Sequence, residues 1–189
     1  MKIPVGISAR HMHITKETYE LLFGASELII RNPLNQPNEF ATASTVDIKN
    51  GDVIIKNVRI LGAFRAYNQV EISASDARVL GLNPKTRASG DLNNTDSITI
   101  IGPLCELTLD NALIIANRHF HLTTKMATQY NIKNGDYYTL TVDNGIKNGQ
   151  MEVFAKVLDE AYFEVHLDTD DANAFQLNQG EELIINIEE

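Results

Sequence analysis

Four of the five histidines in this 189-residue chain belong to two copies of one short pattern. The copies read RHMHIT at residues 10–15 and RHFHLT at residues 118–123. The four histidines are His11, His13, His119 and His121. In a β-strand, residues i and i+2 point to the same face, so both imidazoles of each pattern can converge on one metal ion. The intervening Met12 and Phe120 then point the other way, into a core.

A second pair of matching segments offers a third ligand to each pattern. The fifth histidine, His166, lies in EVHLD at 164–168, and QVEIS at 69–73 aligns with it, so Glu71 stands where His166 stands. Three protein ligands leave one position of a tetrahedral ion open, as catalytic zinc sites do, whereas structural sites are closed by four. The residues therefore predict two metal sites. A set of two histidines and a carboxylate also suits non-haem Fe(II), so ligand type alone leaves the metal open.

The elements that must position these residues read as short strands separated by turns. Residues 45–49 and 53–55 flank an Asn-Gly turn and predict a hairpin, and further strands are expected at 58–62, 97–103, 107–109, 137–142, 151–157 and 182–187. This even spacing of short strands favours small β-barrels over a βαβ sheet.

Four short helices are expected, each directly after a ligand strand. They span 16–23, 74–80, 124–130 and 169–176, and their N-cap residues are Thr15, Ser73, Thr123 and Asp168. Helix N-termini favour anions, which suits a site that handles phosphate, although capping alone also explains these residues.

Arginines supply the candidate anion contacts. Arg65 lies just upstream of Glu71 and has no counterpart in the second half of the chain, so we interpret it as an anion clamp; its planar fork suits bidentate phosphate contacts. We interpret Arg10 and Arg118, which precede the histidines, as structural partners of acidic residues. Ser89 lies in RASGD at 87–91, where a contribution to the site and a plain surface turn both remain open.

Composition narrows the class of protein. The net charge of −9 argues against nucleic acid as a general partner, and a hydrophobic content of 43% is that of an ordinary globular core. Cys105 is the one cysteine; it cannot form an internal disulfide and is expected to be a small buried hydrophobe. No apolar run approaches a membrane span, and no secretory leader is recognisable, so we expect neither membrane insertion nor export.

The motifs together resemble the PduL-type phosphate propanoyltransferases, also called PduL-type phosphotransacylases. The segments that carry the resemblance are 5–13, 70–73, 87–92, 118–121 and 166–170, so it extends over nearly the whole chain. The resemblance implies two small β-barrels with short helical caps, one formed by 1–9 with 117–189 and the other by 10–116, the N-terminal strand joining the C-terminal barrel. It also implies two zinc ions, one held by His11, His13 and Glu71 and the other by His119, His121 and His166. Arg65 then binds phosphate, and Ser89 falls in a motif associated with the active site.

The activity that the resemblance implies is reversible conversion of acyl-CoA and phosphate to acyl phosphate and CoA, with acetyl-CoA or propanoyl-CoA as substrate. Direct transfer between two bound substrates needs no protein nucleophile, which agrees with a single cysteine. Microcompartment members of the family carry an amphipathic N-terminal extension, and here the first ligand is already residue 11, so a cytoplasmic member is expected. A homo-oligomer is possible. Asn117 and Phe120 depart from the family pattern without removing a ligand.

Two other classes of protein use the same residues. A dinuclear metallohydrolase, such as a thioesterase, would activate water at these ligands and would need no free phosphate. A non-catalytic metal-binding protein would have closed sites of four ligands and no use for an asymmetric Arg65.

Overall fold

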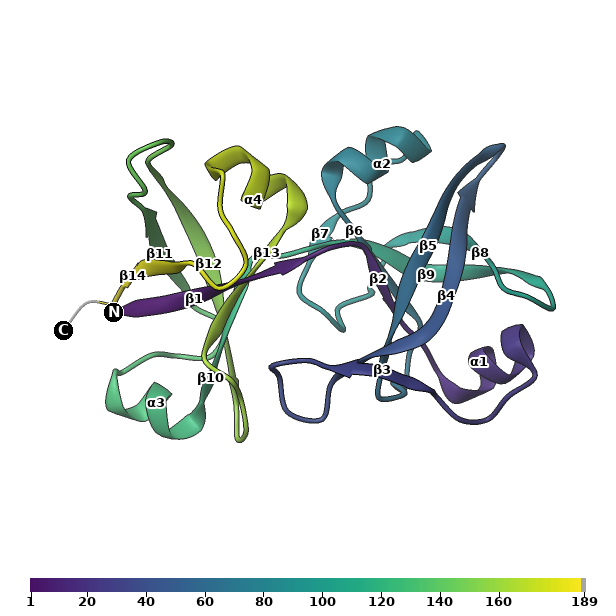
Figure 1. Cartoon of the computed structure of the whole chain (residues 1–189), viewed down its shortest axis with the longest axis horizontal. Helices are drawn as coiled ribbons and strands as arrows, with labels where there is room; N and C mark the ends of the chain where they lie inside the picture. Colours follow the sequence, from purple (N-terminus) through teal and green to yellow (C-terminus); the bar gives the residue numbers. More distant parts are fainter. Residues whose placement is uncertain (188–189) are drawn as a thin grey trace. The chain divides into compact units, whose positions relative to one another are not determined.

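The computed structural model describes residues 1–187 and is mainly β (Figure 1). The chain forms two compact units, one comprising residues 1–9 and 117–189 and the other residues 10–116. Each unit contains a closed β-barrel with short helices attached. Among the described residues, every helix is too short or too polar to cross a lipid bilayer.

The unit of residues 10–116 is built from eight strands and two helices of the described chain. They are β2 (His11–His13), α1 (Lys16–Phe23), β3 (Ile30–Pro33), β4 (Phe40–Asn50), β5 (Val53–Gly62), β6 (Gln69–Ile72), α2 (Ala74–Leu80), β7 (Thr86–Arg87), β8 (Asp96–Ile101) and β9 (Glu106–Ala116). The order β4-β5-β2-β6-β9-β8 closes into a ring because β8 also pairs with β4. Strands β3 and β7 pair at the margins, with β4 and β9.

The other unit combines the first strand of the chain with its last third. Its elements are β1 (Lys2–Ser8), β10 (His119–Thr123), α3 (Thr124–Gln129), β11 (Tyr137–Val142), β12 (Gly149–Leu158), β13 (Glu164–Asp168), α4 (Thr169–Phe175) and β14 (Glu182–Asn186). The closed barrel has the order β1-β13-β10-β12-β11-β14. Strand β1 pairs with β13 and β14, which confirms that the N-terminal strand joins the C-terminal barrel.

The two His-X-His strands have matching neighbours in their barrels. Strand β2 pairs parallel with β5 and antiparallel with β6, and β10 pairs parallel with β12 and antiparallel with β13. Each His-X-His strand is therefore fixed on both sides by other strands of its own barrel. The internal repeat of the sequence stays a prediction.

The helices begin where their caps predict. The side chains of Thr15, Ser73, Thr123 and Asp168 each accept a hydrogen bond from the backbone N–H three residues on. Two helices end one residue earlier than expected, at Gln129 and Phe175. The second ends because Gln176 takes a left-handed conformation, with φ of 55°, which a helix cannot continue.

Several strands are longer than their apolar runs. Strand β5 continues from 53 to 62 where two strands were expected, and β9 extends over 106–116 rather than 107–109. Irregular pairing explains part of this difference: the register of β4 with β5 shifts twice, and Asn57 has a φ of 60°, so the hydrophobic alternation is interrupted while the strand goes on.

The residues between the paired histidines anchor the site strands in the barrel cores. Met12 and Phe120 are both 0% exposed, which confirms that they point away from their histidines. Met12 packs with Ile14, Leu22, Ile60 and Leu113 in one core, and Phe120 packs with Ile3, Leu122, Val153 and Ile185 in the other. Burial of each aromatic or aliphatic side chain contributes about 1.5–3 kcal/mol, which stabilises the register of the short ligand strands.

Candidate metal centres

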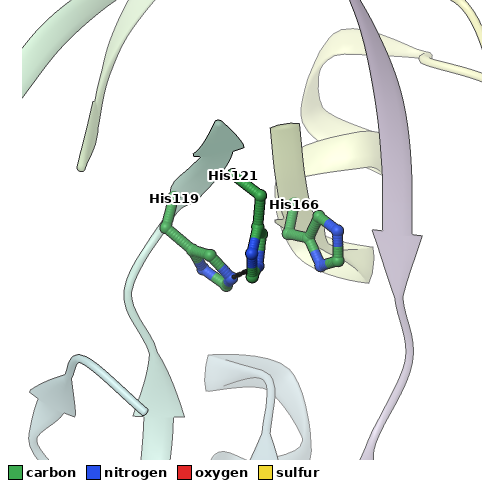
Figure 2. A group of neighbouring side chains, drawn as sticks. All are labelled: His119, His121 and His166. Carbon is green, nitrogen blue, oxygen red and sulfur yellow. Dashed lines mark hydrogen bonds between the residues drawn. The ribbon is translucent and has the colours of Figure 1, made fainter. Parts of the chain in front are cut away.

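The structure brings His119, His121 and His166 together on one barrel. His119 and His121 lie on β10, and His166 lies directly opposite His119 on the antiparallel strand β13. One nitrogen from each imidazole lies within 4.8 Å of the others. The three rings extend from the two strands toward one another (Figure 2). The two histidines of the His-X-His pattern therefore point to the same face of β10, as the alternation of a strand predicts.

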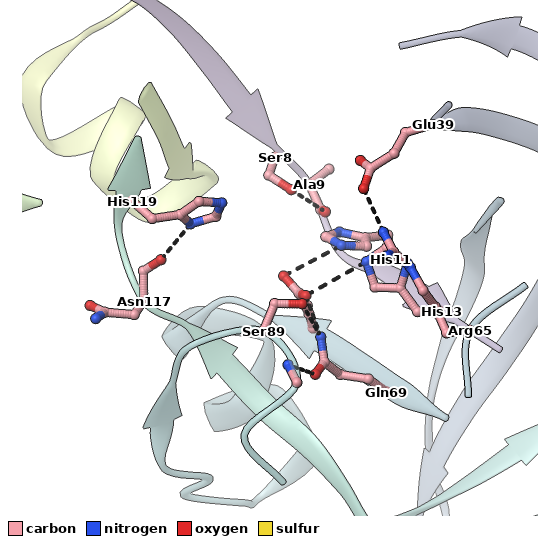
Figure 3. Close-up of polar contacts among 12 residues, drawn as sticks. Ser8, Ala9, His11, His13, Glu39, Arg65, Gln69, Ser89, Asn117 and His119 are labelled. Carbon is pink, nitrogen blue, oxygen red and sulfur yellow. Dashed lines mark hydrogen bonds and ion pairs between the residues drawn. The ribbon is translucent and has the colours of Figure 1, made fainter. Parts of the chain in front are cut away.

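Hydrogen bonds prepare His119 to donate its Nε2 lone pair. Its Nδ1 lies 2.8 Å from the carbonyl oxygen of Asn117, which can only accept, so Nδ1 carries the proton (Figure 3). Its Nε2 lies 3.1 Å from Nε2 of His121. A tetrahedral zinc ion with bonds of about 2.0–2.1 Å to nitrogen separates two ligand nitrogens by roughly 3.3 Å, so this spacing fits an ion.

His121 is held in the neutral form. Its burial, followed by the neighbouring His119, His166 and Lys156, lowers the pKa of His121 to about 2. The side chain is 5% exposed, and its Nδ1 has no hydrogen-bond partner within residues 1–187. A neutral imidazole is the form that binds a metal ion, so His121 can act as a ligand at neutral pH.

The second cluster, His11, His13 and Glu71, lies on the other barrel and is fully buried. His11 is directly opposite Glu71 across the antiparallel strands β2 and β6. Nε2 of His11 lies 3.4 Å from Glu71 Oε2, and Nε2 of His13 lies 3.8 Å from Glu71 Oε1. One donor atom from each of the three side chains lies within 4.8 Å of the others, so the three groups converge on one place.

Gln69 links Glu71 to the loop that carries Ser89, and Figure 3 shows Gln69 beside Ser89. Its amide Nε2 donates to Glu71 Oε1 at 2.5 Å and to the hydroxyl of Ser89 at 2.9 Å. Its Oε1 accepts the backbone N–H of Gly90 at 2.8 Å. Ser89 therefore lies beside the support of a candidate ligand rather than in an isolated surface turn.

Arg65 lies in the same unit and contacts a carboxylate that the sequence pattern did not point to. Its Nη2 donates to Glu39 Oε1 at 2.5 Å, and its backbone N–H donates to the carbonyl of Ile14, directly after the His-X-His strand. Glu39 immediately precedes β4. Hydrogen bonds therefore fix both the backbone and the guanidinium of Arg65, and the guanidinium already contacts one carboxylate, that of Glu39.

The arginines before the two histidine pairs have the structural partners expected for them. Arg118 forms a two-pronged contact with Asp171, with both distances 2.7 Å, and this hydrogen bond raises the pKa of Arg118. Arg10 contacts Asp76 through Nε at 3.1 Å. Both aspartates lie in the first turn of the helix that follows the third ligand, so each contact fastens a helix to its histidine strand.

Four groups that contact the site residues were not identified from the sequence: Gln69, Glu39, the carbonyl of Asn117, and Glu164, whose Oε2 lies 3.0 Å from Nε2 of His166. Gln69 and Glu164 each lie two residues before a candidate ligand, so the two-residue period of a strand could have found them. Cys105 is half-buried, with Sγ 3.4 Å from the carbonyl of Leu21, and belongs to neither cluster.

Comparison with known proteins gives one consistent family. The family model described as phosphate propanoyltransferase matches residues 4–178. A phosphate propanoyltransferase of Thermotoga maritima is 42% identical over 181 residues, which cover 95% of this chain and 86% of that protein. Proteins of the same name from Shewanella putrefaciens and Salmonella typhimurium are 39% and 37% identical, covering 95% and 91% of this chain and 85% and 82% of their own lengths.

Proposed function

Because this chain belongs to the phosphate propanoyltransferase family, we propose that it transfers an acyl group between coenzyme A and phosphate. The chain is an acyltransferase by this membership. In the proposed reaction, acetyl-CoA or propanoyl-CoA reacts with phosphate to give acyl phosphate and CoA, and the reaction runs in both directions.

The observation that carries the proposal is the pair of three-donor clusters. His11, His13 and Glu71 would hold one zinc ion, and the cluster of His119, His121 and His166 would hold a second. A bound zinc ion supplies a Lewis acid, which stabilises a thiolate or polarises an acyl or phosphoryl oxygen. Three donors per cluster leave room for a substrate atom, as catalytic sites require.

Arg65 is the residue we assign to phosphate. A guanidinium has five N–H donors in a planar fork, and the contact with Glu39 engages Nη2. Glu39 thus orients the guanidinium of Arg65. When phosphate binds, the Glu39 carboxylate either shares the guanidinium with phosphate or moves away from it. Ser89 is assigned to the active site only through Gln69, which binds both Ser89 and Glu71.

The reaction needs no nucleophile from the protein. A phosphate oxygen attacks the acyl carbon, the carbon–oxygen bond forms, the carbon–sulfur bond breaks, and the sulfur leaves with the electron pair as CoA thiolate. The role of the side chains is to orient the two substrates, and orientation alone can contribute about 7–11 kcal/mol to lowering a barrier. Cys105 lies against the carbonyl of Leu21 and takes no part.

A thiol-release assay tests the proposal. The protein, loaded with zinc, is given acetyl-CoA, propanoyl-CoA or a longer acyl-CoA, each with and without phosphate, and acyl phosphate is trapped as the hydroxamate. We expect thiol release to require phosphate and to match acyl phosphate in amount. Thiol release without phosphate would favour the metallohydrolase instead, which uses the same ligands to activate water.

A further inference from the structure

In each barrel, the antiparallel strand pair that carries a ligand cluster presents a fourth polar side chain beside the three donors. The fourth residue lies two positions before the third donor and directly opposite the second histidine. It is Gln69, opposite His13, in one barrel and Glu164, opposite His121, in the other. Both are buried, with exposed fractions of 0% and 4%.

Glu164 contacts the third histidine of the cluster, His166. Its Oε2 lies 3.0 Å from Nε2 of His166. Neighbouring strand β1 makes space for it at Gly6, which pairs with His166: a Cβ at Gly6 would lie 2.9 Å from Cδ of Glu164, closer than packed atoms allow. The carboxylate of Glu164 therefore occupies the space that a side chain at Gly6 would take, and a side chain there would have to displace it.

The chemistry of this contact fixes the proton on His166. A carboxylate only accepts hydrogen bonds, so Nε2 of His166 donates, and in the neutral imidazole the lone pair is then on Nδ1. A carboxylate that accepts from a metal-binding histidine sets its tautomer and ring orientation and makes the ring a better ligand.

Gln69 makes the corresponding contact in the other barrel, but it donates the hydrogen bond, whereas Glu164 accepts one. The third donor of that cluster is the carboxylate of Glu71, which can only accept a hydrogen bond. The residue that supports it must therefore donate, and the amide of Gln69 does so at 2.5 Å. A carboxylate at position 69 would instead bring two like charges together. Each group of four thus contains one carboxylate: Glu71, inside the cluster, in one barrel, and Glu164, behind the cluster, in the other.

We propose that Glu164 is a positioning residue of the three-histidine cluster, which orients His166 and supplies from behind the negative charge that Glu71 supplies directly in the other barrel. Gln69 is its uncharged counterpart. The inference rests on the metal binding of the proposed function and adds a residue to it. It concerns the affinity and geometry of the site, with no contact between Glu164 and substrate.

The test isolates the three-histidine cluster in the full-length chain. A parent protein with His11→Ala and His13→Ala lacks two donors of the other cluster and keeps this one. In that background, Glu164→Gln keeps a hydrogen-bond acceptor and removes the charge, and Glu164→Ala removes both. Glu152→Gln, an equal change of charge at an exposed position on β12, is the matched control. Circular dichroism verifies folding, and the nearly isosteric Glu164→Gln serves if Glu164→Ala does not fold.

Zinc affinity is measured by competition with a chromophoric chelator, and the geometry by the visible spectrum of the cobalt-substituted protein. We expect zinc affinity to fall about 10-fold in Glu164→Gln and 10- to 100-fold in Glu164→Ala, with an altered cobalt spectrum, and to stay unchanged in Glu152→Gln. Parental affinity and spectrum in both Glu164 variants would overturn the proposal. Loss in the alanine variant alone would overturn the part assigned to charge.

A readout without metal separates this inference from the proposed function. In the metal-free parent, the nitrogen resonances of His166 should report the Nε2–H tautomer, and Glu164→Ala should lose that preference. If the parent binds no zinc, the metal proposal fails, and an unchanged tautomer in Glu164→Ala would then overturn the role of Glu164 as well.

Discussion

The two barrels carry their candidate ligand clusters on strands with matching neighbours but place the negative charge differently. In the barrel of residues 10–116, Glu71 is itself a candidate ligand, and all three donors are buried. In the other barrel all three donors are imidazoles, and the His166 side chain is 23% exposed, against 7% for His13. The backbone arrangement is therefore shared, while the electrostatics of the two sites are not.

This difference predicts different tasks for the two clusters. A carboxylate ligand offsets one of the two charges of a zinc ion directly, whereas three imidazoles offset neither, and Glu164 acts only through His166. The three-histidine cluster should therefore attract an anionic substrate atom more strongly. The cluster that contains Glu71 should retain its ion more firmly, because a buried carboxylate and a cation attract each other strongly at low dielectric.

Removal of one histidine should have the largest effect, and it tests whether both clusters bind metal. We expect His119→Ala and His11→Ala each to lower the zinc content from two ions to one and to remove nearly all activity, since two donors hold an ion weakly. Zinc content after dialysis and the thiol-release rate measure both effects. Full zinc content and rate in either variant would remove that cluster from the proposal.

Removal of metal should show which of the two clusters binds its ion more tightly. Ions that bind only the folded chain stabilise it by about 3–4 kcal/mol each at 100 to 1,000 times the dissociation constant. The chelated protein should melt at a lower temperature, and the three-histidine cluster should release its ion to a chelator first. An unchanged melting curve after verified removal, or release in the opposite order, would contradict the comparison.

Arg65→Lys tests the proposed anion contact, for which no counterpart of Arg65 was recognised in the sequence of the second half of the chain. A lysine keeps the charge and loses the planar fork, so we expect a loss of about 1–3 kcal/mol in transition-state stabilisation, seen mainly as a higher KM for phosphate. Phosphate is varied at saturating acyl-CoA. Zinc content should stay normal, because Arg65 is no ligand.

The matched variant is Glu39→Gln, which keeps the shape of the partner of Arg65 and removes its charge. If Glu39 competes with phosphate, this variant should lower the KM for phosphate. Unaltered constants in Arg65→Lys would reopen Arg10, Arg87 and Arg118 as the anion contact.

Interactions between residues close in sequence made the helices and the His-X-His strands predictable. Caps such as Thr15 and Ser73 determine helix starts through one hydrogen bond within three residues, so the helices were found to within a residue. The His-X-His spacing needs only the alternation of a strand. Strand ends were less predictable, because the register shifts of β4 depend on pairing partners rather than on the residues of β4 itself.

The supports of the site were harder to predict because they act across the sequence. Glu39 contacts Arg65 over 26 positions, and no pattern links the two. The carbonyl of Asn117 that fixes His119 is a backbone group and has no side-chain signal. Gln69 and Glu164 follow the strand period, but a buried polar residue becomes meaningful only once its neighbours are known.

The pH dependence of stability should reveal the neutral His121. Its folded pKa is about 2 and its unfolded pKa is near 6.5, so below pH 6.5 the unfolded chain takes up a proton that the folded chain refuses. Stability of the metal-free protein should therefore be full above about pH 6.5 and fall by at most about 1.4 kcal/mol per pH unit below it. Denaturant unfolding at pH 7.5, 6.0 and 5.0, with His121→Asn as reference, measures this slope. Equal slopes in the two proteins would show that His121 is not the group responsible.

The smallest expected effect compares the two arginine–aspartate contacts that fasten a helix to each histidine strand. Arg118 binds Asp171 through two atoms at 2.7 Å, and Arg10 contacts Asp76 through one at 3.1 Å, while both arginine side chains are 42% exposed. Exposure limits such pairs to about 0.2–1 kcal/mol, and the two-pronged geometry belongs at the upper end of that range.

Arg118→Ala should therefore lower the melting temperature more than Arg10→Ala, with Arg118→Lys between Arg118→Ala and the unmodified protein. Zinc content should stay at two ions in all three variants, since none of these residues is a donor. Equal melting temperatures for the two alanine variants would mean that the second prong adds nothing, and a larger loss for Arg10→Ala would reverse the comparison.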